Sequence, residues 1–245
     1  MKEYIILPKT KKLSDSCIER RKLNDTDWKN YIFFHLLQFY REVDDNEIIN
    51  LIIQEKRKPI SAIEKAIKKR LKQWLKNDQR FDSHCFIINT EPSSDGETEG
   101  FYDLKFEHSD WRKKYFVFEC KNLDTYSASI DKYVYYKEIQ KGCLHEDGGM
   151  YRYMINKYAK DLDFGGMIGF VIAGDSTLII EKIIQKIHDI FDNNDIGQLT
   201  DKCITRNSIE NNSNTFDSIH LRLEENKIKK HIFMLHHIIM VFTSS

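Results

Sequence analysis

One apolar run restricts the fold of this chain more than any other feature. Residues 166–173 read Gly-Met-Ile-Gly-Phe-Val-Ile-Ala, without a charged or hydrogen-bonding side chain. Successive side chains of a strand point to opposite faces of a sheet, so a strand that is apolar throughout is buried on both faces. We therefore expect this run to be a central strand of a sheet that is flanked by helices.

The first third of the chain is predicted to be helical. Asp27 and Trp28 open a pattern in which apolar residues recur every three or four positions. Asp44 and Asp45 are suited to cap a second helix, and Pro59 separates it from a third. The three helices are expected near residues 27–39, 44–52 and 61–76, and the third carries an apolar stripe of Ile60, Ile63, Ile67, Leu71, Trp74 and Leu75.

The hydrophobic pattern changes beyond residue 80. Short runs rich in β-branched and aromatic residues predict strands, and stretches rich in Gly, Asn and Asp predict loops. Strands are expected at 84–89, 101–107, 115–120, 166–173, 216–223 and 228–242 (the last also fits a partly helical segment), helices at 127–140, 150–160 and 177–191, and loops at 91–100 and 192–214. This order favours an α/β (α+β) fold with a helical segment at 1–58 packed on a core at 59–245.

Composition sets the broad class of the protein. A chain of 245 residues with 41% hydrophobic content is long enough for one large domain with a substantial core. The net charge is zero, so a case for a polyanionic partner must rest on local charge. The five cysteines form no CxxC pair, which argues against a disulfide framework or structural zinc. Without a signal-peptide pattern or a membrane-spanning run, the protein is expected to be cytoplasmic.

Charged residues end an apolar strand at Glu119 and Lys121. Both follow the apolar run 116–118, and because they are two positions apart, their side chains share one face of a strand. Asp103 lies in the preceding predicted strand, which a hairpin would bring alongside. Charges at the end of a buried sheet are costly unless they have a purpose. A divalent metal and a phosphate would supply one.

The residue types suit metal-assisted chemistry. Asp103 and Glu119 offer the hard oxygen ligands that Mg²⁺ or Mn²⁺ prefers, and the carbonyl of Cys120 would complete the metal shell. Such a metal polarises a phosphoryl oxygen and activates water, while Lys121 would orient that water or balance charge on the phosphate. The competing interpretation is a solvated ion pair, because acid-x-lysine triplets are common in a chain of which 31% is charged.

Glu64 is a further candidate, with two interpretations. It lies within the apolar stripe of the helix predicted at 61–76. An acid on an apolar helix face needs a partner, which favours a place beside the same metal. Alternatively, Glu64 belongs to a capping box and bonds back to the amide of Ser61. The sequence leaves both interpretations open.

The same helix has a strong local charge bias. Between residues 56 and 76 there are nine basic residues, and Glu64 is the only acid. This bias predicts a face that contacts phosphate, although a solvated helix face is the more common role of such a run. The candidate nucleic-acid contacts are Lys65, Lys68, Lys69 and Lys72, together with Arg152 at the start of a later helix.

Two histidine-containing segments are interpreted structurally. Ser218, His220 and Arg222 alternate along one predicted strand, which favours an exposed polar face over a cleft. His236 and His237 interrupt an apolar run and are expected to pack or cap there.

The ordered set Glu64, Asp103 and Glu119-Cys120-Lys121 resembles the PD-(D/E)XK nuclease superfamily, which has the restriction-endonuclease-like fold. The resemblance covers about residues 60–175, and 149–175 also looks like segments of uncharacterised bacterial defence nucleases. It implies an acid-bearing helix, a meander of strands that bears Asp and Glu-x-Lys, and then a helix and further strands around a mixed central sheet. Tyr102 stands where the motif name has proline, a position that varies.

The resemblance also implies a function. Asp103 and Glu119 would bind Mg²⁺ or Mn²⁺, Lys121 would assist the water, and Glu64 would be an accessory acid. The expected activity is Mg²⁺-dependent hydrolysis of phosphodiester bonds by an endonuclease, with DNA as the substrate. An antiviral, restriction-type role is expected by analogy, with a homodimer or a partner protein. The alternative hypothesis is a catalytically inactive module that keeps the fold and binds nucleic acid or protein.

Overall fold

A computed structural model describes residues 23–57, 59–94, 100–111, 114–140, 142–192, 196–223 and 230–243. The three helices predicted in the first third of the chain are confirmed, and a short fourth helix follows them. Asn24 and Asp27 form a reciprocal capping box at the start of the first helix, and Asp44 caps the second by accepting the amide of Asn46. The four helices are α2 (Asp25–Glu42), α3 (Asp45–Glu55), α4 (Ile60–Asn77) and α5 (Gln79–Ser83).

The described strands form a seven-stranded mixed sheet, in the order β1-β2-β3-β6-β9-β8-β7, and a separate two-stranded hairpin. The first three strands are an antiparallel meander, β6 pairs in parallel with both β3 and β9, and the last two pairs are again antiparallel. This confirms a mixed α/β architecture. The sheet strands are β1 (Ile87–Thr90), β2 (Leu104–Glu107), β3 (Tyr115–Leu123), β6 (Phe164–Val171), β7 (Gln198–Arg206), β8 (Thr215–Leu223) and β9 (Lys230–Val241).

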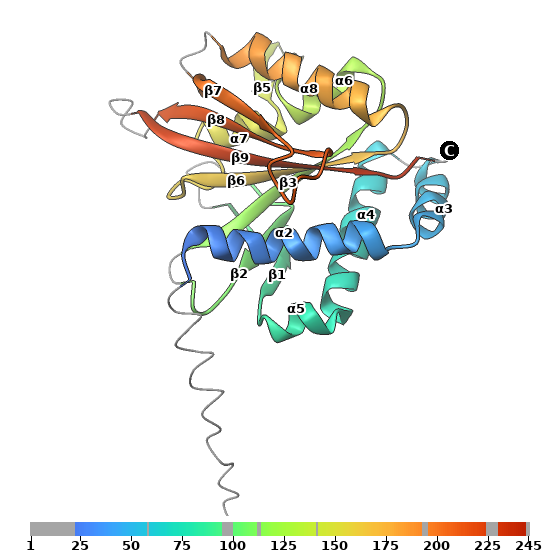
Figure 1. Cartoon of the computed structure of the whole chain (residues 1–245). Helices are drawn as coiled ribbons and strands as arrows, with labels where there is room; N and C mark the ends of the chain where they lie inside the picture. Colours follow the sequence, from blue (N-terminus) through green and yellow to red (C-terminus); the bar gives the residue numbers. More distant parts are fainter. Residues whose placement is uncertain are drawn as a thin grey trace, which may run out of the picture.

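Helices cover both faces of the sheet (Figure 1). On one face lie α2 and α4, and on the other lie α6 (Ser127–Tyr133), α7 (Gly149–Met154) and α8 (Ser176–Phe191). The strand predicted from the apolar run is confirmed, since every residue of β6 is buried. Gly166 lets β3 and β6 approach: a Cβ there would lie 2.2 Å from the Phe118 ring.

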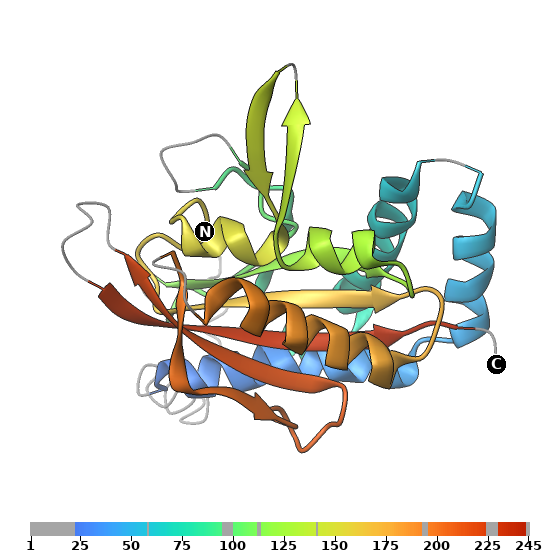
Figure 2. The ribbon, with the colours of Figure 1, turned by 90° about the horizontal axis from the view of Figure 1, so that it is seen from above.

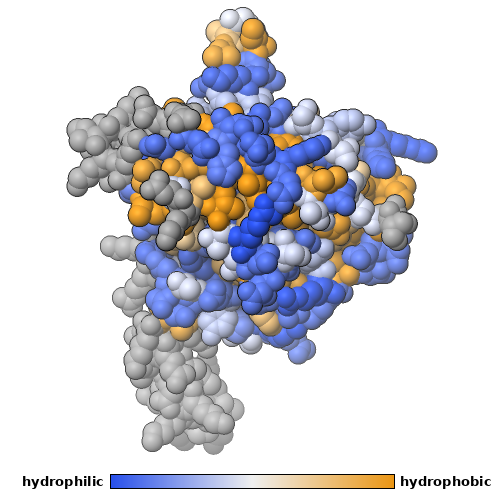
Figure 3. Space-filling model, turned by 45° about the horizontal axis from the view of Figure 1, so that its top comes forward, coloured by the Kyte–Doolittle hydropathy of each residue, from blue (hydrophilic) through white to orange (hydrophobic). Residues whose placement is uncertain are grey.

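The helix predicted at 127–140 is wrong beyond Tyr133. A hairpin of β4 (Tyr136–Gln140) and β5 (Cys143–Asp147) follows instead and projects from the body of the molecule (Figure 2). Gly142, at φ +81°, supplies the left-handed conformation of its turn. The paired tip residues Ile139 and Leu144 are 78% and 64% exposed, and Figure 3 shows the apolar surface at the tip.

Other boundaries also differ from expectation. The loop expected at 192–214 contains β7, and the helix expected at 150–160 is the single short α7. The last segment is a strand, β9, without helical residues in its described part. The boundary near residue 58 stays a prediction, although Trp28 and Leu36 of α2 belong to the same buried cluster as Phe116 and Phe170 of the sheet.

The predicted exposed face of Ser218, His220 and Arg222 is wrong, because all three side chains are fully buried. Ser218 and His220 form a chain of hydrogen bonds with His237 and Tyr133. Arg222 donates to five backbone carbonyls, one in α7 and four in the segment between α7 and β6, at 2.8 to 3.3 Å. Burying polar groups is tolerable there because each finds a hydrogen-bond partner.

Candidate active site

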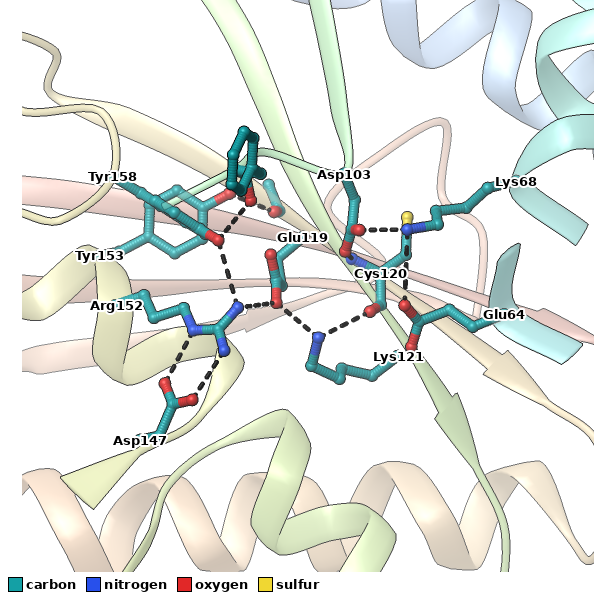
Figure 4. Close-up of polar contacts among 12 residues, drawn as sticks. Glu64, Lys68, Asp103, Glu119, Cys120, Lys121, Asp147, Arg152, Tyr153 and Tyr158 are labelled. Carbon is teal, nitrogen blue, oxygen red and sulfur yellow. Dashed lines mark hydrogen bonds and ion pairs between the residues drawn. The ribbon is translucent and has the colours of Figure 1, made fainter. Parts of the chain in front are cut away.

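Charged side chains from four elements meet at the middle of β3 (Figure 4). Glu119 and Lys121 lie on β3, and because they are two positions apart their side chains share one face of the strand. Asp103 directly precedes β2. Glu64 and Lys68 come from α4, and Arg152 comes from α7. The four acidic and lysine candidates of the sequence motif are therefore brought together.

Asp103 ties α4 to β3 through both of its oxygens. Oδ2 accepts the backbone N–H of Cys120 at 2.7 Å. Oδ1 accepts a hydrogen bond from the ammonium of Lys68. The carboxylate is thus held at the edge of β3 by one backbone amide and one buried cation.

Glu119 is the deepest acid of the cluster, with 1% of its side chain exposed. Its Oε1 accepts from Lys121 and, at 2.8 Å, from Arg152. Its Oε2 is buried and has no hydrogen-bond partner among the residues that the structure describes. Leaving a buried charged oxygen unsatisfied costs about 1–3 kcal/mol or more, so this atom calls for a bound proton, water or cation.

Lys121 bridges two acceptors on its own strand. Its ammonium donates one hydrogen bond to Oε1 of Glu119 and another, of 3.0 Å, to the carbonyl of Cys120. Burial by itself would lower the pKa of Lys121, but the nearby Glu119, Glu64 and Asp103 carboxylates outweigh it and raise the pKa. The side chain is therefore a permanent cation in this cluster.

Glu64 faces the cluster from α4 and pairs with Lys68, four residues later, at 3.5 Å. The capping-box interpretation is wrong, because the helix begins after Pro59 at the N-cap and has no side-chain capping hydrogen bond. Burial raises the pKa of Glu64, and the neighbouring Asp103 adds to this while Lys121 and Lys68 oppose it. Glu64, the acid on the apolar face of α4, thus has its ion-pair partner, Lys68, within the cluster.

Arg152 is an internal cation rather than a free surface contact. It holds Asp147, the last residue of β5, through two hydrogen bonds of 2.7 Å, and it also donates to Glu119 and to the hydroxyl of Tyr158. Burial alone would raise the pKa of Asp147, yet Arg152 holds it at about 2. The phosphate contact predicted for Arg152 stays a prediction.

Burial dominates the electrostatics of Glu119. It raises the pKa of this carboxyl to about 7, with Asp103 adding to the effect and the Lys121 and Arg152 cations opposing it. Two acids with raised pKa values, Glu64 and Glu119, therefore lie on either side of Asp103. A group of close carboxylates favours either protonation or an additional cation.

The basic face predicted for α4 divides into two parts. Lys65 and Lys69 are exposed, and Lys72 is half-buried and donates to Thr90 at 3.0 Å. Lys68 is only 4% exposed and points into the acid cluster, so it does not share that surface.

The donor set fits a hard divalent cation. Asp103, Glu119 and the Cys120 carbonyl offer only oxygen ligands, and the unpartnered Oε2 of Glu119 is one of them. Over the described ranges, no three acidic, histidine or cysteine side chains stand in an arrangement that is ready to hold a metal. Lys68 instead binds Oδ1 of Asp103, and Lys121 and Arg152 bind Oε1 of Glu119.

Sequence reasoning assigned Lys68 to a phosphate-contacting face and missed two members of the cluster, Asp147 and Tyr158. Lys68 was signalled by its spacing from Glu64, because residues i and i+4 lie on the same helix face. Asp147 and Tyr158 left no comparable signal, since the first strand of the hairpin was read as helix and no element was predicted at its second strand. Tyr158 donates to the carbonyl of Phe101 at 2.6 Å and so fixes the segment before Asp103.

Comparison with known proteins gives no relative for this chain. No family model matches it, and neither the curated proteins nor the solved structures contain a match. Within the described part of the chain, no helix is both long and apolar enough to cross a membrane.

Proposed function

We propose that this chain is a metal-dependent nuclease of the PD-(D/E)XK type that hydrolyses phosphodiester bonds, with DNA as its substrate. The observation that carries the proposal is the convergence of Asp103, Glu119 and Lys121 at β3, with Glu64 beside them. Three acids and a lysine at the middle of a buried sheet are costly without a chemical purpose.

The order of elements supports the restriction-endonuclease-like core that the resemblance implies. The acid-bearing helix α4 precedes the antiparallel meander of β1, β2 and β3, and α6, the β4–β5 hairpin and α7 then lead to the parallel strand β6. Asp103 directly precedes β2 and Glu119 lies on the neighbouring β3, an order that agrees with the motif. This argument concerns fold and spacing, and it leaves the substrate to experiment.

In the proposed reaction, a Mg²⁺ or Mn²⁺ ion bound by Asp103, Glu119 and the Cys120 carbonyl would polarise the phosphoryl oxygen and activate a water. Lys121 would act as a cation that stabilises charge on the phosphate, because its raised pKa makes it a poor base. Arg152 would hold Glu119 in orientation. Glu64 would add negative charge on the far side of Asp103.

A cleavage assay tests the proposal. Plasmid, linear duplex, single-stranded DNA and RNA would each be incubated with the protein and Mg²⁺. We expect cleavage of at least one DNA form, and a loss of about 100-fold or more in Asp103→Asn, Glu119→Gln and Lys121→Met. A matched control is Glu107→Gln, since Glu107 pairs with Lys105 two residues away on neighbouring β2 but lies outside the cluster. Cleavage that persists in all three cluster variants would overturn the site.

One observation favours a second candidate, the inactive binding module. Three cations, Lys68, Lys121 and Arg152, already face the acids of the cluster, so the charges are largely balanced without a metal. This candidate predicts salt-dependent binding of nucleic acid or protein without cleavage. A Mn²⁺ affinity that disappears in Asp103→Asn would count against it.

The cellular setting is proposed by analogy only. A restriction-type defence role, a homodimer or partner protein, and a cytoplasmic location follow from the resemblance and from the sequence pattern. The exposed Lys65 and Lys69 of α4 are the surface cations that we propose for phosphate contact.

A further inference from the structure

Lys68 is a buried lysine that contacts two carboxylates. It comes from the middle of α4, is 4% exposed, and its ammonium contacts Asp103 and Glu64 at once (Figure 4). Lysine is rarely buried to this degree unless it is paired. Its neighbours at the next turns of the same helix, Lys65 and Lys72, do not touch the cluster in this way.

The ammonium of Lys68 lies between two carboxylates, a position that suits a cation. Burial would lower its pKa, but the carboxylates of Asp103 and Glu64 outweigh burial and raise it. A metal that binds Asp103 at the oxygen that Lys68 contacts would have to displace the Lys68 ammonium. The long, unbranched side chain of Lys68 makes such a movement feasible.

The oxygen that Lys68 occupies is one that a metal would need. Oδ2 of Asp103 is already bonded to the Cys120 amide, so Oδ1 is its remaining strong acceptor, and Lys68 binds there. The Oε2 atom of Glu119 is also buried, and no described residue is a hydrogen-bond partner for it. Among the described residues, the cluster thus has one carboxylate oxygen, Oδ1 of Asp103, bound by an internal cation, and another, Oε2 of Glu119, bound by none.

We propose that Lys68 is a place-holding cation, which neutralises Asp103 and Glu64 in the metal-free protein and is displaced from Asp103 when a divalent metal binds. Metal loading is then an exchange of cations, so the affinity for metal is lower than the oxygen ligands alone would give. The proposal rests on the proposed function in one respect, the identity of the incoming group as a metal.

Direct binding of Mn²⁺ to the full chain tests this, by calorimetry or by electron paramagnetic resonance of free Mn²⁺, without any substrate. Lys68→Met keeps the length of the side chain and removes the charge, and we expect it to bind Mn²⁺ about tenfold more tightly or better. Lys68→Arg keeps a cation and is expected to stay near the wild-type affinity. Lys72→Met is the matched control on the same helix and is expected to change nothing.

A second measurement on the unaltered protein covers the case in which Lys68→Met does not fold. Amine-selective labelling followed by peptide mass spectrometry should find Lys68 protected without metal and several-fold more reactive with saturating Mn²⁺, while Lys65 stays reactive throughout. Unchanged Mn²⁺ affinity in folded Lys68→Met, or continued protection of Lys68 in metal-saturated protein, would overturn the inference. Absence of Mn²⁺ binding in both wild type and Lys68→Met would instead overturn the proposed function, and the inference with it.

Discussion

Arg152 joins the projecting hairpin to the deepest acid of the cluster. One of its terminal nitrogens donates to Oε1 of Glu119 at 2.8 Å, and two other nitrogens hold Asp147, where β5 ends. Any movement of the hairpin base is therefore transmitted to Glu119. Because the guanidinium is planar and its hydrogen bonds are paired, the contact fixes orientation as well as charge.

Substitution of Arg152 should alter the pH dependence of the site. Arg152 favours the ionised form of Glu119, so Arg152→Met should raise the pKa of that carboxyl further above its ordinary value of 4.5. In the nuclease assay, the acidic limb of the pH–rate profile should move to higher pH, with a lower maximal rate.

The control is Arg206→Met, which removes an arginine from an exposed pair with Glu181. It should leave the profile in place. A profile for Arg152→Met that coincides with that of the wild type would contradict a positioning role for Arg152.

Arg222 should be critical for stability rather than chemistry. It is fully buried and donates to five carbonyls, one in α7 and four between α7 and β6, so Arg222→Met removes five buried hydrogen bonds. We expect a loss of about 3 kcal/mol or more in the free energy of unfolding, measured by chemical denaturation.

Arg206→Met serves as the comparison again, because its ion pair is half exposed and should be worth about 0–1 kcal/mol. Equal free energies of unfolding for Arg222→Met and Arg206→Met would contradict a stabilising role for the hydrogen bonds from Arg222 to the backbone carbonyls.

Buried histidines should make the fold sensitive to acid. Burial lowers the pKa of His220 from 6.5 to about 4, so the folded chain keeps it neutral while the unfolded chain protonates it. Its contribution to stability is complete above pH 6.5 and declines by about 1.4 kcal/mol per pH unit as the pH falls toward 4. Glu119 acts in the opposite direction, since its raised pKa favours the folded state at low pH.

The contribution of His220 is isolated by a difference measurement. The unfolding free energy of His220→Gln, which retains hydrogen-bonding groups for Gly197 and Ser218, should fall less steeply than that of the wild type between pH 6.5 and 4. Parallel curves for the two proteins would show that His220 does not titrate on unfolding.

The part of the site that lies on regular strands could be predicted from the sequence. Glu119 and Lys121 share a face because strands alternate, and Asp103 is brought to them by the hairpin of two strongly patterned strands. The central strand at Gly166 was equally clear, since an apolar run of that kind must be buried on both faces.

The remainder depends on contacts that are distant in the sequence. The segment 136–147 contains few apolar residues, so its period does not separate a hairpin from a helix, and Asp147 and its bond to Arg152 were missed with it. Likewise, β7 is polar and is a strand because it pairs with β8, and Arg222 is buried because the carbonyls of a separate segment receive it. Lys68 was identified as basic, but its partner Asp103 is 35 residues away.

The most direct test of the account is a crystal structure of the full chain soaked with Mn²⁺, with anomalous scattering used to locate the metal. We predict one Mn²⁺ bonded to Asp103, Glu119 and the carbonyl of Cys120, at about 2.0–2.3 Å, with the ammonium of Lys68 moved away from Asp103. A saturated crystal without Mn²⁺ at these oxygens, in which Lys68 still binds Asp103, would contradict the account.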